Sequence, residues 1–115
     1  MSNIIVLDND NFSRTLYNPE EQESAAIVVY FSASWCLPCQ NMKPIFEQLA
    51  NHFEKKAIKF GVVDIAQSPI LAPKYGIKSV PTIAVFKGSR LIKAMPGEFS
   101  LSKAIEALNQ IFCVN

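Results

Sequence analysis

Two cysteines separated by two residues are the part of this 115-residue chain best suited to chemistry. They lie in the pentapeptide Trp35-Cys36-Leu37-Pro38-Cys39, between an apolar run and a segment of helical periodicity. This spacing at a strand-to-helix junction is typical of a redox pair. A helix N-terminus presents free N–H groups and the positive end of the helix dipole, so it favours the thiolate of Cys36. The thiolate is the form that attacks a disulfide.

A structural zinc site is the alternative interpretation of the cysteine pair. It needs two further ligands, and only His52 and Cys113 remain, each alone at a distant position. We therefore expect no metal site. We interpret His52 as a helix-surface residue and Cys113 as an incidental thiol, with a regulatory or dimerising thiol as the alternative for Cys113.

The elements that must position the cysteines follow from the pattern of apolar residues. The run before the pair predicts a strand at Ile27–Phe31, buried on both faces because it lacks polar alternation. After the pair, apolar residues at helical spacing predict a helix that extends to Phe53. Pro44 lies inside this helix, removes one hydrogen bond and should kink it near its first turns.

The remaining pattern predicts an α/β domain. Further strands are expected at Ile4–Leu7, Ile58–Asp64, Thr82–Phe86 and Leu91–Met95, with a hairpin turn at residues 87–90.

We expect a short helix carrying Phe12 and Leu16, capped by Asp8 or Asp10, then a polar loop at residues 18–24. A second short helix is expected at Ser68–Tyr75, stopped by Gly76, and a last helix is expected after Ser100. Its apolar stripe is Leu101, Ala104, Ile105, Leu108, Ile111 and Phe112. The element order predicts a central sheet between helices.

Composition limits the possible functions. Half of the residues are hydrophobic, 18% are charged and the net charge is +1, which indicates one globular domain without a basic surface for nucleic acid. No apolar stretch reaches the ~20 residues of a membrane span, and the N-terminus lacks the pattern of a signal peptide. Three cysteines, an odd number, fit a reducing compartment better than a disulfide scaffold. We therefore expect a cytoplasmic protein that binds neither membrane nor nucleic acid.

The chain strongly resembles the thioredoxin family in four features that occur in the family's order and spacing. These are the Trp35–Cys39 motif after an apolar strand, Pro44 in the next helix, residues 72–77 leading to Val80-Pro81-Thr82, and Phe86-Lys87-Gly88 followed by Gly97. The resemblance implies a single thioredoxin domain over residues 1–115. It also implies the thioredoxin fold, in which a central mixed five-stranded sheet is flanked by four helices.

The resemblance also assigns roles to residues. Cys36 would attack a substrate disulfide, and Cys39 would resolve the mixed disulfide. Pro81 matches the family's cis-proline, and the backbone of Val80 would bind an extended substrate by strand addition; an ordinary strand-initiating proline is the alternative.

Four further residues are expected to contact the substrate. Trp35, Leu37 and Pro38 would form the rim of the site, and Gly97 would let a partner approach closely. A core tryptophan and a plain turn glycine are the alternatives for Trp35 and Gly97.

The chain departs from the family at three positions. Thioredoxins usually carry a buried aspartate before the active site and a lysine on the next strand. Counting back from Cys36 and from Asp64 gives Tyr30 and Phe60. A phenol with a reference pKa of about 10 is a poor base at neutral pH, so we expect slow resolution of the mixed disulfide. Leu37 stands where glycine is usual, which suggests a narrower and more hydrophobic partner surface.

The resemblance implies a thiol–disulfide oxidoreductase that reduces protein disulfides and serves electron transport in cell redox homeostasis. Thioredoxin reductase or another dithiol donor would recharge it. No cofactor or metal is expected, since the cysteines are the redox group, and a monomer is expected. The alternatives are a disulfide oxidase or isomerase, a thioredoxin-like protein dedicated to a single client, and a binding module built on the fold.

Overall fold

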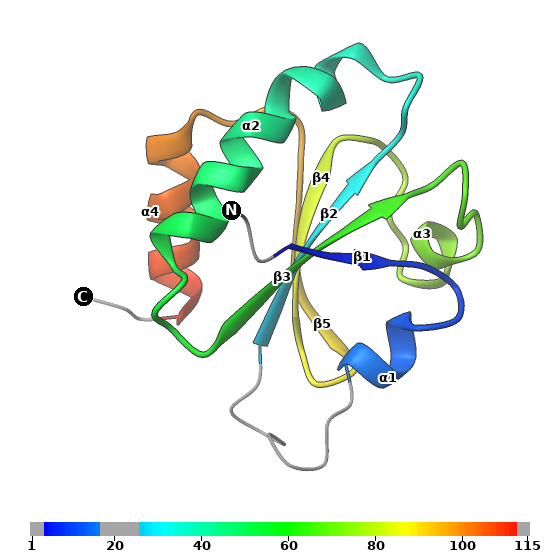
Figure 1. Ribbon diagram of the computed structural model, residues 1–115, viewed down its shortest axis with the longest axis horizontal. Helices are drawn as coiled ribbons and strands as arrows, with labels where there is room; N and C mark the ends of the chain where they lie inside the picture. The colour runs from blue at the N-terminus through cyan, green and yellow to red at the C-terminus, as the bar shows by residue number, and fades with distance from the viewer. Residues whose placement is uncertain (1–3, 17–25, 113–115) are drawn as a thin grey trace.

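The computed structural model describes residues 4–16 and 26–112, which form five strands and four helices (Figure 1). The elements in chain order are β1 (Ile4–Leu7), α1 (Phe12–Leu16), β2 (Ala26–Ser32), α2 (Leu37–His52), β3 (Ile58–Asp64), α3 (Leu71–Lys74), β4 (Thr82–Lys87), β5 (Arg90–Pro96) and α4 (Leu101–Phe112). The expected loop at residues 18–24 and Cys113 lie outside the described residues. No helix in the described part of the chain is long and apolar enough to cross a membrane.

The strands form one mixed sheet in the order β1-β3-β2-β4-β5. β1 and β2 run parallel to β3, whereas β4 is antiparallel to both β2 and β5. β2 therefore lies at the centre of the sheet and is hydrogen-bonded along both edges. The expected mixed five-stranded sheet with four helices is confirmed.

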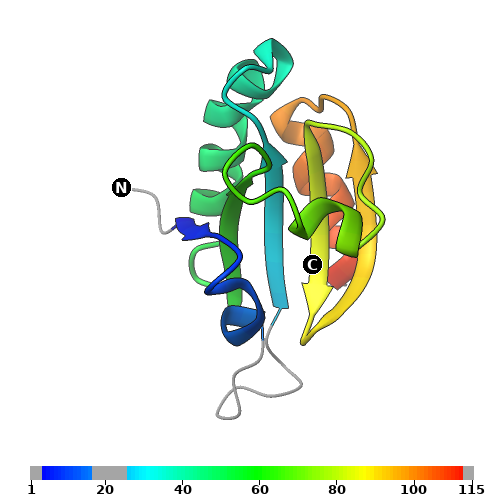
Figure 2. The same ribbon diagram turned by 90° about the vertical axis from the view of Figure 1, so that its right-hand side faces the viewer.

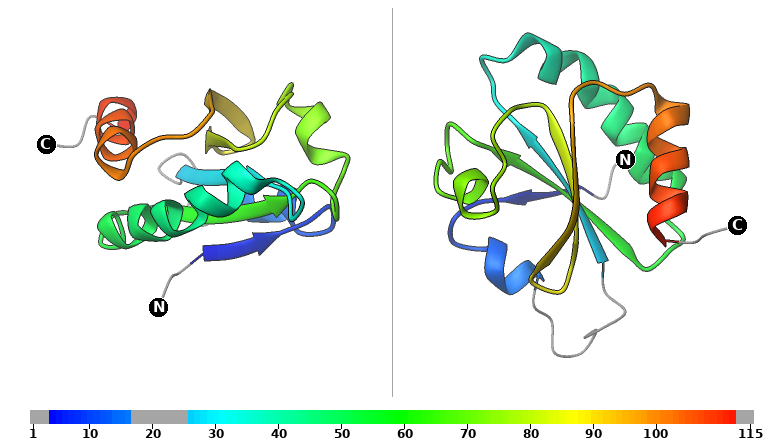
Figure 3. Two further views of the ribbon diagram at one scale, coloured as in Figure 1. Left: turned by 90° about the horizontal axis from the view of Figure 1, so that it is seen from above. Right: turned by 180° about the vertical axis from the view of Figure 1, so that it is seen from behind.

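Helices cover both faces of the sheet (Figures 2 and 3). Because side chains alternate along a strand, Val28 and Tyr30 of β2 face a core made with α2 and α4, while Val29 and Phe31 face a core made with α1 and α3. β2 is therefore buried on both faces, as its apolar sequence predicts. In α4, Ala104 and Leu108 are buried, and the rest of its expected stripe packs half-buried around them.

Local capping follows the sequence closely, with one correction. The Asp8 carboxylate accepts hydrogen bonds from the N–H groups of Asp10 and Asn11 just before α1, and the Ser100 hydroxyl accepts from Lys103 N–H at the start of α4. The helix expected from Ser68 begins only at Leu71. Ser68 N–H instead donates to the Asp64 carbonyl and closes a turn after β3.

Three segments that are distant in the sequence meet the sheet at the same end of its strands. Phe31 of β2 is paired with Thr82 of β4, and Thr82 is paired with Pro96 of β5. The chain beyond β2, the chain before β4 and the chain after β5 therefore lie beside one another. The cysteine motif, the Val80–Pro81 segment and Gly97 belong to these three segments.

Candidate active site

The cysteine pair lies at the N-terminus of α2. Cys36 is the N-cap residue, with extended backbone angles (φ −97°, ψ 109°), and Cys39 lies in the first helical turn. The Cys36 N–H donates to the Ala33 carbonyl at 3.1 Å, which fixes the approach of the chain to the helix. The Cys39 N–H points at Cys36 Sγ, 3.2 Å away. The first turn therefore offers a backbone donor to the sulfur of Cys36.

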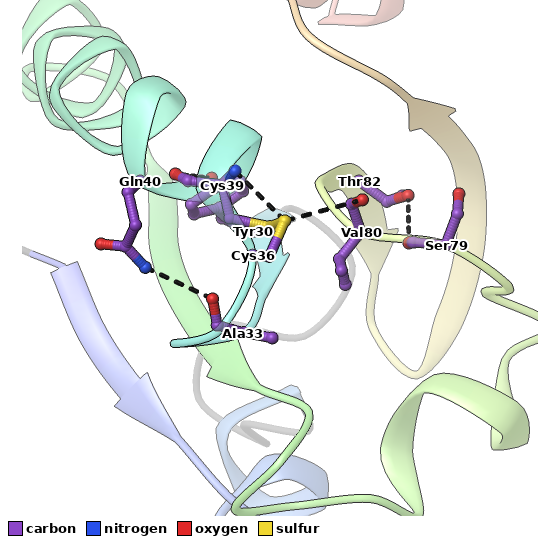
Figure 4. The surroundings of a disulfide bond; sticks show 8 residues. All are labelled: Tyr30, Ala33, Cys36, Cys39, Gln40, Ser79, Val80 and Thr82. Atoms are coloured by element: carbon purple, nitrogen blue, oxygen red, sulfur yellow. Dashed lines mark hydrogen bonds between the residues drawn. A yellow bond between two sulfur atoms is a disulfide. The ribbon is translucent and has the colours of Figure 1, made fainter.

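The two cysteines form a disulfide, with their Cα atoms 5.2 Å apart (Figure 4). Cys36 is 6% exposed and Cys39 is fully buried. Together with Ala33 they form a small apolar cluster, against which Ile65 and Val80 pack. Of the two sulfur-bearing residues, only Cys36 reaches the surface.

Val80, the residue before Pro81, lies directly opposite the disulfide (Figure 4). The Val80 carbonyl oxygen is 3.9 Å from Cys36 Sγ, and the Val80–Pro81 peptide bond is cis. The Thr82 hydroxyl donates to the Ser79 carbonyl at 2.8 Å and braces the turn. Val80 is half-buried, and Pro81 is buried.

Gly97 joins the site from the third segment. Its N–H donates to the Pro81 carbonyl at 2.9 Å, so the chain after β5 is tied to the proline turn. Its φ of +99° lies in the region that favours glycine. This angle by itself accounts for a glycine here, and the close approach of a partner stays a prediction.

The rim of the site is apolar and exposed. Trp35 and Leu37 are 69% and 71% exposed, and Pro38 is also exposed. The alternative of a core tryptophan is therefore wrong. Trp35 and Val80 share a cavity of about 340 Å³ beside α3. The other residues lining this cavity are Ile65, Pro69, Ala72, Pro73, Ile77, Lys78 and Ser79.

Tyr30 lies beneath the first turn of α2 (Figure 4). Its hydroxyl donates a hydrogen bond to the Cys39 backbone carbonyl, and the residue is 2% exposed. Burial raises the pKa of Tyr30 above its ordinary value of 10.0; a hydrogen bond with Ser32 lowers the pKa, and the Glu98 carboxylate raises it. The hydroxyl is therefore a neutral donor near the resolving cysteine. The count back from Cys36 singles out Tyr30 in the sequence, but it does not predict the hydrogen bond to the Cys39 carbonyl.

The register of β2 and β3 places the side chains of Tyr30 and Phe60 on the same face of the sheet. Tyr30 is paired with Val62, and Phe60 lies two residues earlier along β3, paired with Val28. The rings of Tyr30 and Phe60 both pack on Phe46 in the core beneath α2. Neither of these two β3 positions beside Tyr30 holds a lysine. Val62 and Tyr30 also line a second cavity of about 450 Å³ with Ser32, Gln40, Lys43 and Asp64 among its walls.

No metal site is found in residues 4–16 and 26–112. These residues contain no group of three or more histidine, cysteine, aspartate or glutamate side chains that could hold a metal ion. His52 is exposed at the last residue of α2, as expected for a helix-surface residue.

The fold and the site define an α/β protein with a redox-active disulfide at the start of a helix. A family model for thioredoxin matches residues 3–110. The chain therefore belongs to the thioredoxin family. Family membership and the Cys36–Cys39 disulfide together support thiol–disulfide oxidoreductase activity.

Similar proteins include thioredoxins from bacteria and from a plant. Thioredoxin of Chlorobaculum thiosulfatiphilum is 42% identical over 72 residues, 63% of this chain and 66% of that protein. Chloroplastic thioredoxin M4 of Arabidopsis thaliana is 42% identical over 89 residues, 74% of this chain and 45% of that protein. Thioredoxin of Buchnera aphidicola subsp. Acyrthosiphon pisum (strain APS) is 32% identical over 110 residues, 96% of this chain and 97% of that protein. The first two matches thus span less than two thirds of those relatives, whereas the third spans nearly its whole length.

Proposed function

We propose that this chain reduces protein disulfides by dithiol–disulfide exchange, with Cys36 attacking and Cys39 resolving. The observation that carries the proposal is the asymmetry of the pair at the start of α2. Cys36 reaches the surface and its sulfur receives a backbone N–H, while Cys39 is fully buried within bridging distance. The helix N-terminus stabilises the thiolate of Cys36, and this is the form that attacks.

Two exchange steps complete the reaction. The Cys36 thiolate attacks one sulfur of the substrate disulfide, and the other substrate sulfur leaves as a thiolate. The Cys39 thiolate then attacks Cys36 Sγ, so the Cys36–Cys39 disulfide forms and the second substrate sulfur leaves. Two electrons pass to the substrate, and the leaving thiolates take protons from solvent or from the thiol of Cys39.

Substrate binding is assigned to the apolar rim and to the proline turn. We propose that Trp35, Leu37 and Pro38 contact the client, and that the backbone of Val80 pairs with an extended client segment beside Pro81. Gly97, tied to the same turn, adds a surface without a side chain. The exposure of Trp35 and Leu37 and the 3.9 Å separation between Val80 O and Cys36 Sγ support this assignment.

The remaining parts of the proposal concern the setting of the reaction. The chain acts as a single monomeric domain in the cytoplasm, without a metal or organic cofactor. Its clients are proteins that contain disulfides, and thioredoxin reductase or another dithiol donor returns it to the dithiol form. The similarity to thioredoxins supports a donor of this kind.

Insulin reduction tests the proposal directly. The wild-type chain should precipitate insulin with dithiothreitol as the electron source, and it should also do so with NADPH and thioredoxin reductase. Cys36→Ser should be inactive with either source. If wild type and Cys36→Ser reduced insulin at equal rates, the reductase proposal would fail and the binding-module alternative would remain. Activity with dithiothreitol but none with thioredoxin reductase would indicate that a dedicated donor, and not thioredoxin reductase, recharges the chain.

The reduction potential separates reductase from oxidase. A value near about −270 mV, as in thioredoxin, supports the proposed direction, while one near about −120 mV, as in a strong oxidant, contradicts it.

The specificity of the rim is tested by Leu37→Gly. If turnover with the reductase and with a panel of disulfide substrates is unchanged, Leu37 does not set the partner surface.

A further inference from the structure

We propose that Tyr30 is a positioning residue for the cysteine pair, acting through the backbone of the first turn of α2. This inference rests on the proposed function. The hydroxyl of Tyr30 donates its hydrogen bond to the backbone carbonyl oxygen of Cys39 rather than to a sulfur atom. Its effect therefore passes through the peptide groups that hold Cys36 and Cys39.

Those peptide groups form a continuous chain of hydrogen bonds. The Cys39 carbonyl and the Gln40 N–H belong to one peptide unit, and the Gln40 N–H donates to the Cys36 carbonyl at 3.2 Å. A hydrogen bond to one end of a peptide unit polarises the group and strengthens the bond at its other end. Tyr30 thus acts on the backbones of both cysteines. The Gln40 side chain ties the same turn to the Ala33 carbonyl at 3.3 Å.

Tyr30 itself is held firmly, so it can serve as an anchor. It lies on the central strand, paired with Val62 on one side and Ile83 on the other. Its ring stacks on Phe46 of α2, with the centroids 5.0 Å apart. The hydroxyl therefore has a fixed position, and its raised pKa keeps it a donor at neutral pH.

The anchor matters most when the cysteines are not joined. In the disulfide form the S–S bond itself closes the turn. The dithiol and the mixed disulfide with a substrate lack that bond, so the packing and the backbone contacts of the first turn must hold Cys39 near Cys36. Holding two reacting groups in place is what makes an intramolecular step fast. Loss of the hydroxyl should therefore slow the attack of Cys39 more than the attack of Cys36.

Stopped-flow reaction with 5,5′-dithiobis(2-nitrobenzoate) separates the two steps. Attack by Cys36 releases one nitrothiobenzoate, at a rate proportional to reagent concentration. Attack by Cys39 on the resulting mixed disulfide releases the second, at a rate independent of that concentration. All variants carry Cys113→Ser so that only the pair reacts, and the pH is set low enough to resolve both phases.

Tyr30→Phe removes the hydroxyl and keeps the ring. We expect the second phase to slow about fivefold relative to the first, as for loss of one ordinary hydrogen bond. Tyr75→Phe is the matched control, because Tyr75 is another tyrosine whose pKa burial raises, but it packs on Phe12 and Phe86 in the opposite core. It should leave both phases unchanged.

The outcomes separate this inference from the proposed function. If the unsubstituted pair shows no concentration-independent phase, or if Cys39→Ser retains one, the dithiol mechanism itself fails. If that phase is present but its ratio to the first phase stays within twofold in Tyr30→Phe, the positioning role is wrong. An equal slowing in Tyr75→Phe would also overturn it, because the effect would then reflect general loosening of the fold.

Discussion

Tyr30 stands where thioredoxins usually supply a buried carboxylate to the second cysteine. A neutral phenol can donate a hydrogen bond to the helix but cannot accept the proton of Cys39 at neutral pH. We therefore expect Tyr30 to hold the backbone of the first turn without accepting the proton of Cys39.

Tyr30→Asp should therefore speed the resolution of the mixed disulfide. A positioned base typically accelerates proton transfer by 10²–10⁴, so we expect a gain of at least about tenfold at pH 7 even after the hydroxyl is lost. Burial raises the pKa of a carboxyl group, and the gain should grow as pH rises through that pKa. The measurement is the concentration-independent phase, with Tyr30→Asn as the control that lacks a base. No acceleration at pH 7 would contradict the missing-base hypothesis.

The raised pKa of Tyr30 also predicts how stability depends on pH. In the unfolded chain the phenol ionises near its ordinary value of 10.0, whereas in the folded chain burial keeps it protonated. Above about pH 10 the unfolded state therefore binds fewer protons, and the free energy of unfolding falls as pH rises. The stabilisation is fully present below pH 10.

Urea denaturation of wild type and Tyr30→Phe at about pH 9 and pH 11 measures this contribution. Wild type should lose more stability across that interval than Tyr30→Phe, since the two proteins differ only in the Tyr30 hydroxyl. Equal losses would show that Tyr30 ionises alike in the folded and unfolded states.

At the scale of elements, α2 connects the cysteines to the sheet. Phe46, two turns after the pair, stacks on Tyr30 and meets Phe60 of β3 edge to face. It is fully enclosed in the core between α2 and the sheet. The position of the first turn thus depends on aromatic packing further along the same helix.

Phe46→Ala should lower the free energy of unfolding by about 3–5 kcal/mol, because it removes a buried ring and leaves a cavity. Gln48→Ala, an exposed position on the same helix, should change it by no more than about 0.5 kcal/mol. Chemical denaturation of both variants checks the difference. A loss below about 1 kcal/mol for Phe46→Ala would mean that α2 is held to the sheet elsewhere.

Local residue patterns predict most of the elements, whereas contacts between elements are not encoded in them. The observed bounds of β1 and β3 agree with the strands expected at Ile4–Leu7 and Ile58–Asp64, because apolar runs between polar turns define strands. Helix α3 begins at Leu71 and not at the expected Ser68, because the Ser68 N–H donates to the Asp64 carbonyl and closes a turn. The Tyr30 hydroxyl donates to a backbone carbonyl nine residues away on the next helix, and no residue pattern predicts that bond.

For the whole molecule, the disulfide links the redox state to stability. The bond closes a loop with a sequence separation of only three residues. In the chain-entropy model so short a loop removes little freedom from the unfolded chain, corresponding to about 2 kcal/mol. In the disulfide form the two Cα atoms lie 5.2 Å apart, within the usual range for a disulfide.

We therefore expect the oxidised form to unfold with a free energy about 2 kcal/mol higher than the reduced form. Urea denaturation of the Cys113→Ser chain with and without dithiothreitol measures the difference. Cys36→Ser, which cannot form the bond, should show none. If the reduced form were as stable as the oxidised form, the disulfide would form no more readily in the folded chain than in the unfolded chain.

The central place of β2 has a consequence for the lifetime of the site. This strand is hydrogen-bonded along both edges and buried on both faces, so we expect its amide protons to exchange with deuterium only when the domain opens as a whole. β1 and β5 lie at the edges of the sheet and should exchange through local fraying. The segment that leads into Cys36 would then be attached to the slowest-exchanging part of the protein. We therefore expect the cysteine pair to stay assembled through the many small openings that occur between one encounter with a partner and the next.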